Sequence, residues 1–219
     1  MIEVFGRLNS VNVWKPLWVL EELGQPYEQV PVTQAYRLPN PEAPDAPINT
    51  RSPAFLAVNP NGHIPSMKDG DLVLHESLAI NLYLAKKFGG PLAPANLAED
   101  GECAMWTLWA ATEAEPHTIM ILYHRLMKQG DERKPELADA AVVALRAPFK
   151  VLDAALAKTG YLVGGRFTVA DINVAEVIRY AQPAPELFED VPHLKAWLAA
   201  CQARPAFKAM VEKRNAEPA

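Results

Sequence analysis

The pattern of hydrophobic and polar positions divides the chain into a mixed first part and a purely helical second part. Before residue 88, short apolar runs bounded by Gly, Pro and Asn alternate with segments of helical periodicity. In chain order they predict a strand at residues 2–6, a helix at 10–24 and a strand at 27–32. A helical turn at 54–57, a hairpin at 64–74 and a helix from 76 follow. Parallel strands need a crossover helix, so the first three form a β-α-β unit. We therefore expect an α/β domain at the start of the chain.

The first helix contains one residue that conflicts with its pattern. Ser10 is well placed to cap it, and Gly24 is a plausible stop. Pro16, however, deletes one hydrogen bond near the end of the first turn. We expect a distorted or late-starting helix. After the second strand, five prolines within residues 33–53 predict a long loop, which we expect to form one wall of a site.

Residues 59–84 carry the most informative pattern. A turn at residues 59–62 precedes Ile64, which the following Pro65 pushes into an extended conformation. Proline has no N–H, so the sheet ladder is interrupted there and neighbouring backbone groups can pair with a short extended peptide. The amides at Glu76 and Ser77, where a helix starts, would bind a carboxylate of the same guest. The stretch predicts a seat for a small acidic peptide; the alternative is a hairpin capped by a helix, with no ligand.

The second part of the chain reads as an all-α helical bundle. A segment rich in Gly and Pro at residues 88–96 separates it from the first part. Helical patterns then cover residues 97–128, with an interruption at Pro116, followed by 134–158, a helix from 167, 191–201 and 204–211. Thr168 and Asp171 have the spacing of a capping box, with Asp in place of the usual Glu or Gln. We assign both a structural role and not a catalytic one.

Composition narrows the possible classes of protein. The 219 residues suffice for one large or two modest domains, and a net charge of −5 leaves no basic footprint for nucleic acid or anionic lipid. No secretory signal or membrane span is visible, and Cys103 and Cys201 form no C-x-x-C motif. His117 and His124 lie seven residues apart without an evident third ligand, so we expect no metal. The expected location is the cytoplasm, without nucleic acid or membrane as a partner.

The runs NPNGHIP, DGDLVLHES and AINLYLAKKF resemble the glutathione-binding half of a cytosolic glutathione transferase, and RPAFKAM resembles the family's last helix. The resemblance covers nearly the whole chain and suggests a serine-type, bacterial-like member. It implies a thioredoxin-like domain at residues 1–86, ordered βαβ-α-ββα, a linker at 87–97 and a helical domain at 98–219 that contributes the electrophile site. It also implies a homodimer, and glutathione as co-substrate. Glutathione, γ-Glu-Cys-Gly, is an acidic tripeptide that suits the predicted seat.

The resemblance also implies roles for the residues of the seat. In the family the proline after the turn is cis, the preceding residue pairs with the cysteinyl backbone, and a Glu-Ser pair holds the γ-glutamyl end. Here these positions are Ile64, Pro65, Glu76 and Ser77. His63 and Arg51 match the positions that bind the glycyl carboxylate, although Arg51 could equally be a surface charge. Arg37 is a weaker third option.

The chemistry of such a site is the conversion of a thiol into a thiolate. A free cysteine thiol has a pKa of about 8.5, and a helix N-terminus with one good hydrogen-bond donor can lower that pKa. The resemblance assigns this donor to Ser10, whose other use would be as a helix cap. Asn12 is a second candidate. No Tyr or Cys occurs within residues 1–25, which disfavours tyrosine and mixed-disulfide mechanisms.

The electrophile is expected to be small and hydrophobic. Four residues of the long helix could line its site: Trp106, Trp109, Glu113 and His117. The two tryptophans could equally be core or dimer contacts. The predicted activity is conjugation of glutathione to the electrophile, as in detoxification. A glutathione-dependent isomerase, dehalogenase or peroxidase, and a non-catalytic binding module on the same fold, are the alternatives.

Overall fold

A four-stranded mixed sheet forms the base of the first of two units into which the chain divides. The computed structural model describes residues 1–217, and this unit comprises residues 1–88 and 205–217. The strand order is β2-β1-β3-β4, with β1 and β2 parallel and the other pairs antiparallel. The strands are β1 (Ile2–Phe5), β2 (Tyr27–Val30), β3 (Ser66–Asp69) and β4 (Leu72–His75). This confirms the predicted β-α-β and β-β-α units and their order.

Helix α1 (Trp14–Glu22) joins β1 to β2 and starts late, as Pro16 predicts. Pro16 occupies the third helical position, where a backbone N–H would have no partner within the helix. The N-cap is Val13, so the prediction that Ser10 caps this helix is wrong. The helix ends at Glu22, and the predicted stop, Gly24 (φ +59°), follows the C-cap Leu23, with hydrogen bonds from Gly24 N to Glu21 O (3.2 Å) and from Gln25 N to Leu20 O (3.0 Å).

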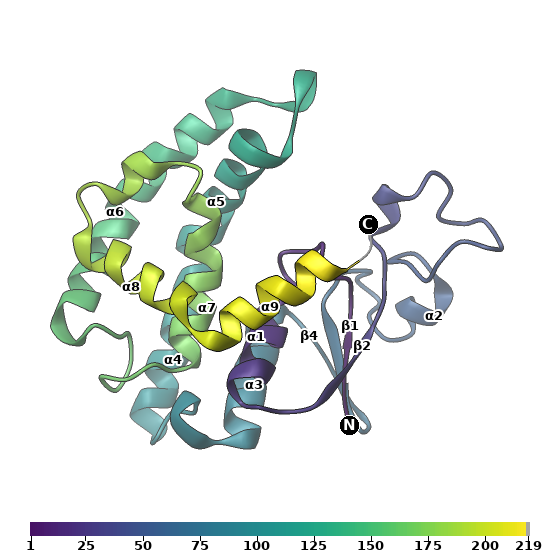
Figure 1. Ribbon diagram of the computed structural model, residues 1–219, viewed down its shortest axis with the longest axis horizontal. Helices are drawn as coiled ribbons and strands as arrows, with labels where there is room; N and C mark the ends of the chain where they lie inside the picture. The colour runs from purple at the N-terminus through teal and green to yellow at the C-terminus, as the bar shows by residue number, and fades with distance from the viewer. Residues whose placement is uncertain (218–219) are drawn as a thin grey trace. The chain divides into compact units, whose positions relative to one another are not determined.

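The last helix, α9 (Pro205–Ala216), belongs to this first unit. It packs on α1, as Figure 1 shows. The Phe207 ring lies edge-on to Trp18, with 5.0 Å between ring centroids, and 6.5 Å from Trp14. Because these aromatic contacts hold α9 to α1, the structure differs from the predicted helical domain at 98–219: the second unit ends at Arg204.

The hairpin and helix that follow β2 agree with the sequence pattern. The Ile64–Pro65 bond is cis, β3 begins directly after it, and Gly70 (φ +61°) turns the chain into β4. Helix α3 (Ser77–Phe88) starts where the pattern predicted and packs on α1. Between β2 and β3 lie a 3-10 turn at Ala35–Arg37 and the short helix α2 (Pro53–Leu56).

The second unit, residues 89–204, is helical among the residues described. Its α-helices are α4 (Leu97–Trp109), α5 (Glu115–Ile121), α6 (Pro135–Thr159), α7 (Val169–Ile178) and α8 (Pro192–Ala203). Wider π-turns occupy Ala110–Ala114 and Leu122–Met127, and 3-10 turns occupy Gly90–Leu92, Gly130–Glu132, Arg179–Ala181 and Pro185–Phe188. The first π-turn confirms the predicted interruption at Pro116, since proline has no N–H and its ring disturbs the preceding α-helical turn. Within residues 1–217 no helix is both long and apolar enough to cross a membrane.

Helix α7 is the centre of this unit, and all its residues are buried. It packs against α4, α5 and α8. The predicted capping box is present: Thr168 N donates to Asp171 Oδ2 at 2.8 Å. The other oxygen, Oδ1, accepts from Trp197 Nε1 at 2.9 Å and from Leu162 N at 3.2 Å. Burial raises the pKa of Asp171, and these donors oppose that shift, so both carboxyl oxygens are used in holding the fold.

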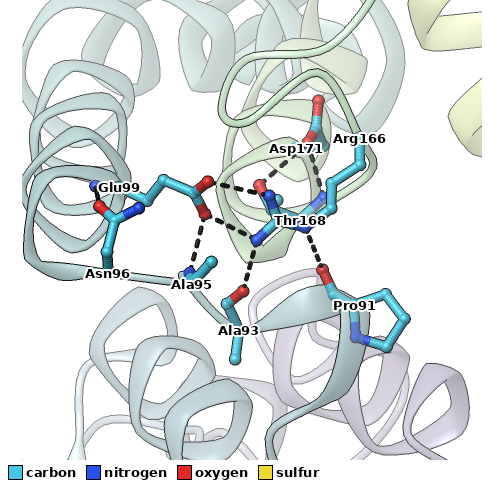
Figure 2. Close-up of polar contacts among 8 residues, drawn as sticks. All are labelled: Pro91, Ala93, Ala95, Asn96, Glu99, Arg166, Thr168 and Asp171. Carbon is cyan, nitrogen blue, oxygen red and sulfur yellow. Dashed lines mark hydrogen bonds and ion pairs between the residues drawn. The ribbon is translucent and has the colours of Figure 1, made fainter.

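Arg166 connects the start of α7 to the segment that opens this unit (Figure 2). Its guanidinium makes a two-pronged contact with Glu99 (3.1 and 2.6 Å) and donates to the carbonyls of Pro91 (3.3 Å) and Ala93 (2.9 Å). Gly164 (φ +62°) makes room, since a Cβ there would lie 2.1 Å from Arg166 Nη1. One guanidinium thus fixes two loops that are far apart in the sequence.

This cluster predicts a pH dependence of stability. The hydrogen bonds from Arg166, and next from Ala95 N, lower the pKa of Glu99 to about 2 from its ordinary 4.5. Because the folded-state pKa is depressed, the stabilisation is complete above pH 4.5 and is lost as the pH falls through about 2. In thermal unfolding, Glu99→Gln should lower the midpoint most near neutral pH and progressively less below pH 4.5. Glu102→Gln, an exposed change on the same helix, is the control. A Glu99→Gln deficit independent of pH would contradict the assignment.

Candidate active site

A cavity of about 480 Å³ lies in the first unit, and all eight residues predicted for catalysis and glutathione binding line it. Its wall comes from three parts of the chain: the β1–α1 loop, the loop between β2 and β3, and the start of α3. The lining residues are Ser10, Asn12, Gln34, Ala35, Tyr36, Thr50, Arg51, Asn59, Gly62, His63, Ile64, Pro65, Glu76 and Ser77.

Ile64 offers the cavity an unpaired stretch of backbone. The pairing of β3 with β1 begins at Ser66, opposite Phe5, and Pro65 has no N–H to extend it. Within residues 1–217, neither the N–H nor the C=O of Ile64 makes a hydrogen bond. Its side chain is 8 % exposed and anchors the residue in the core. A fixed residue with two available backbone groups can pair with an extended peptide.

Asn59 holds the turn that precedes Ile64. It is 1 % exposed, and its Nδ2 donates to His63 O (2.8 Å) and Ser66 Oγ (3.1 Å). Its Oδ1 accepts from Asn61 N at 3.0 Å, in an Asx-turn. The side chain therefore fixes both sides of the cis bond. The sequence identified Asn59 only as a turn residue; the NPNG run is the signal that could have suggested more.

The proline-containing loop forms one wall of the cavity, through Gln34, Tyr36 and Arg51 among others. This agrees with the expectation from the sequence, although Gln34 and Tyr36 were not predicted. Gly62 (φ +62°) lies directly against this loop, since a Cβ on it would be 2.7 Å from Thr50 O. The predicted third option, Arg37, is not among the lining residues; its Nε donates to Gln34 Oε1 at 2.7 Å.

Ser10 lies in the turn between β1 and α1, 5 % exposed, with Asn12 beside it in the cavity wall. Its backbone N–H donates to Arg7 O (3.1 Å) and its C=O accepts from Val13 N (3.1 Å). No side-chain hydrogen bond caps α1 at Val13. Among residues 1–217 the Ser10 hydroxyl makes no hydrogen bond, so it does not cap the helix and remains available at the cavity.

The start of α3 places a carboxylate and a helix N-terminus at the cavity. Glu76 has φ +70°, the one non-glycine residue with positive φ among those described. Such a left-handed residue costs about 1–3 kcal/mol and is typical of ligand sites. The conformation places Glu76 at the cavity just before Ser77 opens a twelve-residue helix. The helix N-terminus favours an anion, and the Glu76 carboxylate favours an ammonium group.

The four residues predicted for the electrophile lie on the second unit. Trp106 and Trp109 of α4 are edge-to-face, with ring centroids 5.4 Å apart, and Trp106 is buried. Glu113 is exposed on the first π-turn, and His117 is half-buried on α5. They share one continuous helical segment, and their role stays a prediction. Among the described residues no cluster of three His, Cys, Asp or Glu is placed to hold a metal.

Comparison with known proteins adds to this geometry. The profile "Glutathione S-transferase, N-terminal domain" matches residues 4–92, and "Glutathione S-transferase, C-terminal domain" matches residues 114–205. Glutathione S-transferase 3 of Zea mays is 36 % identical over 96 % of this chain and 93 % of its own. The chain belongs to the glutathione S-transferase family.

Two further similar proteins support this assignment to the glutathione S-transferase family. Glutathione S-transferase GstB of Escherichia coli is 35 % identical and covers 96 % of this chain and 98 % of its own. The solved theta class glutathione S-transferase of Xanthomonas axonopodis pv. citri, with glutathione bound, has a TM-score of 0.80 and 33 % identity, over 96 % of each chain. The likeness to family members thus extends over both units and confirms the predicted fold class and family.

The contacts of Asn59 predict that it stabilises the cavity. Asn59→Ala removes the side-chain donor to His63 O and Ser66 Oγ and the acceptor for Asn61 N. Asn59 is buried, so water does not readily replace these hydrogen bonds. We expect a loss of about 1–3 kcal/mol in the free energy of unfolding, measured in urea. Asn61→Ala, at the exposed end of the same turn, is the control and should change it by less than about 0.5 kcal/mol. Equal effects of the two changes would contradict the role of Asn59.

Proposed function

We propose that this glutathione S-transferase binds glutathione in the cavity of its first unit, lowers the pKa of the thiol with Ser10 and adds the thiolate to a small hydrophobic electrophile. The observation that carries the proposal is the unpaired backbone of Ile64 at the cavity wall. An extended cysteinyl residue would exchange two hydrogen bonds with it, continuing the sheet by one residue beyond Pro65. Family membership supports transferase activity, and the relative with glutathione bound supports the ligand.

The charges around the cavity match the two ends of glutathione. Glu76 and the N-terminal amides of α3 at Ser77 suit the α-ammonium and α-carboxylate of the γ-glutamyl residue. Arg51 and His63 suit the glycyl carboxylate, which a guanidinium can bind through two hydrogen bonds. Binding both ends fixes the cysteinyl sulfur between them, near the loop that carries Ser10 and Asn12.

The protein contributes to the reaction by orientation and by stabilising the thiolate. A serine hydroxyl that donates to sulfur favours the ionised form, and a fixed sulfur needs less ordering to reach the electrophile. Trp109 is half-buried and offers an aromatic surface for a hydrophobic electrophile, and the buried Trp106 packs edge-to-face against it. Glu113 and His117 lie on the same helical segment. We keep these four as the proposed electrophile site.

Calorimetry with glutathione tests the proposal against a non-catalytic module. Binding together with turnover of a panel of electrophiles is the expected result. Binding without turnover would favour a ligand carrier, and no binding would favour an assembly module. Preferential turnover of cis/trans diketo acids, haloalkanes or peroxides would assign the same thiolate to isomerase, dehalogenase or peroxidase chemistry.

We also propose a homodimer located in the cytoplasm. Strand β4 is an edge of the sheet, and its Leu72 and Val73 are 39 % and 38 % exposed, which leaves apolar surface for a partner. Neither Cys103 nor Cys201 forms a disulfide, which suits a reducing compartment.

Light scattering tests the dimer and should give a mass twice that of one chain. Val73→Glu, which places a charge on the apolar edge strand, should lower the measured mass toward that of one chain. A monomeric wild type would contradict the dimer.

Ser10→Ala tests the donor to sulfur. The change removes a hydrogen bond to a charged group, worth about 1.5–3 kcal/mol. It should therefore raise the pKa of the bound glutathione thiol by about 1–2 units, because one unit corresponds to about 1.4 kcal/mol. Ultraviolet absorbance of the thiolate against pH measures it. The dissociation constant of glutathione well below that pKa should change little.

Two matched changes make the result specific. Asn12→Ala should leave the pKa of the bound thiol unchanged. If Asn12→Ala raises that pKa and Ser10→Ala does not, Asn12 and not Ser10 is the donor to the sulfur. Ser77→Ala should weaken glutathione binding without moving the thiol pKa. Unchanged affinity in that variant would mean that the γ-glutamyl end binds elsewhere.

A further inference from the structure

The loop wall of the cavity is organised by one buried side chain, that of Asn49. The loop carries Pro39, Pro41, Pro44 and Pro47, each of which lacks a backbone N–H. It therefore has few donors with which to form regular structure of its own. Asn49 is nevertheless 0 % exposed, within a segment whose other residues are mostly exposed or half-buried. A fully buried asparagine in such a loop needs partners for all its polar groups.

Asn49 uses both its side-chain donor and its side-chain acceptor. Its Nδ2 donates to Pro41 O at 2.9 Å and to Pro47 O at 3.0 Å, joining two points of the loop. Its Oδ1 accepts from Arg51 N at 2.9 Å. Its backbone N–H donates to Ser52 Oγ at 2.9 Å, and its C=O accepts from Ser52 N at 3.0 Å. One residue thus closes the loop and fixes the two residues after Thr50.

A short parallel bridge pairs Asn49 with Thr33, which follows β2 of the sheet. Thr33 N donates to Ile48 O and Thr50 N donates to Thr33 O, both at 2.9 Å. Ala35 N donates to Thr50 Oγ1 at 3.0 Å. Asn49 lies at the centre of this bridge, opposite Thr33. The main chain that leads into Arg51 is therefore held on both sides.

The Arg51 side chain itself has no such support. Among residues 1–217 its guanidinium makes no hydrogen bond or ion pair, and the side chain is exposed at the cavity. Its position therefore depends on the main chain at residue 51, which the Asn49 Oδ1 contact sets.

We propose that Asn49 is a positioning residue for the glycyl carboxylate of glutathione, acting through the main chain of Arg51. This rests on the proposed function, in which Arg51 binds that carboxylate. The amide closes a proline-containing loop that cannot close itself, and so directs the guanidinium into the cavity. Asn49 does not touch the thiol or the γ-glutamyl residue in this arrangement.

Asn49→Asp tests the proposal, with Asn40→Asp as the matched control. The aspartate keeps the shape and the acceptor for Arg51 N but sets an oxygen against two carbonyl oxygens, so the loop must open. Asn40 lies exposed in the same loop and only accepts, from Glu42 N at 3.3 Å, which aspartate also does. Both variants add the same charge. Calorimetry would use glutathione and γ-glutamylcysteine, which lacks the glycyl residue.

The expected result is selective for the tripeptide. Asn49→Asp should raise the dissociation constant of glutathione about tenfold and that of γ-glutamylcysteine less than about twofold. Asn40→Asp should change neither by more than about twofold. The Michaelis constant for glutathione should rise in Asn49→Asp, while kcat at saturation and the pKa of the bound thiol stay unchanged. In an Arg51→Ala background Asn49→Asp should add less than about twofold, because both changes remove the same contact.

Other outcomes overturn the proposal. Equal weakening of both peptides by Asn49→Asp would mean a general collapse of the cavity, and no weakening would mean that the loop closes without the amide. If the losses of glutathione affinity in Asn49→Asp and Arg51→Ala add fully in the double variant, Asn49 does not act through Arg51. If Asn49→Asp fails to fold, Asn49→Ala is measured on the same pair of peptides, with the same expected selectivity. A wild type that binds neither peptide would overturn the proposed function itself, whereas a wild type that binds both with no selective loss would overturn only the role of Asn49.

Discussion

The structure of the candidate site depends on the point where the ladder between β1 and β3 stops. Pro65 offers no N–H, so β3 begins at Ser66 and the backbone of Ile64 is left without a partner in the described chain. Polar backbone groups at such a place must be satisfied by water or by a ligand. The buried Ile64 side chain and the Asn59 amide hold this backbone still, so a guest is not required to order it.

Two buried asparagines support the two walls that face this backbone. Asn59 fixes the turn before Ile64, and Asn49 closes the loop that leads into Arg51. The walls touch where Gly62 lies against Thr50 O, so only glycine fits there. Preorganisation of this kind lowers the entropy that a flexible tripeptide and its site would otherwise lose on binding. In the second unit the buried Asp171 and the half-buried Arg166 also fix loops through several hydrogen bonds each.

Most elements of the first unit, and eight of the residues that line its cavity, could be predicted from the sequence because short-range rules decide them. Pro16 delays α1, the NPNG run turns the chain, and the Ile64–Pro65 pair ends the ladder. The role of Asn49 could not be predicted, since its partners lie on a loop of prolines without periodicity. Nor could the place of α9, whose Phe207 finds two tryptophans far away in the sequence. Ser10 was misjudged as a cap because Val13 takes that place, one residue before the helix.

A crystal structure of the protein with glutathione bound measures the central interaction most directly. We expect the cysteinyl main chain to lie antiparallel to Ile64, with hydrogen bonds to both the N–H and the C=O of Ile64, and the sulfur to lie near the β1–α1 loop. Glutathione bound elsewhere, or held only by its two ends with the Ile64 backbone bonded to water, would contradict it.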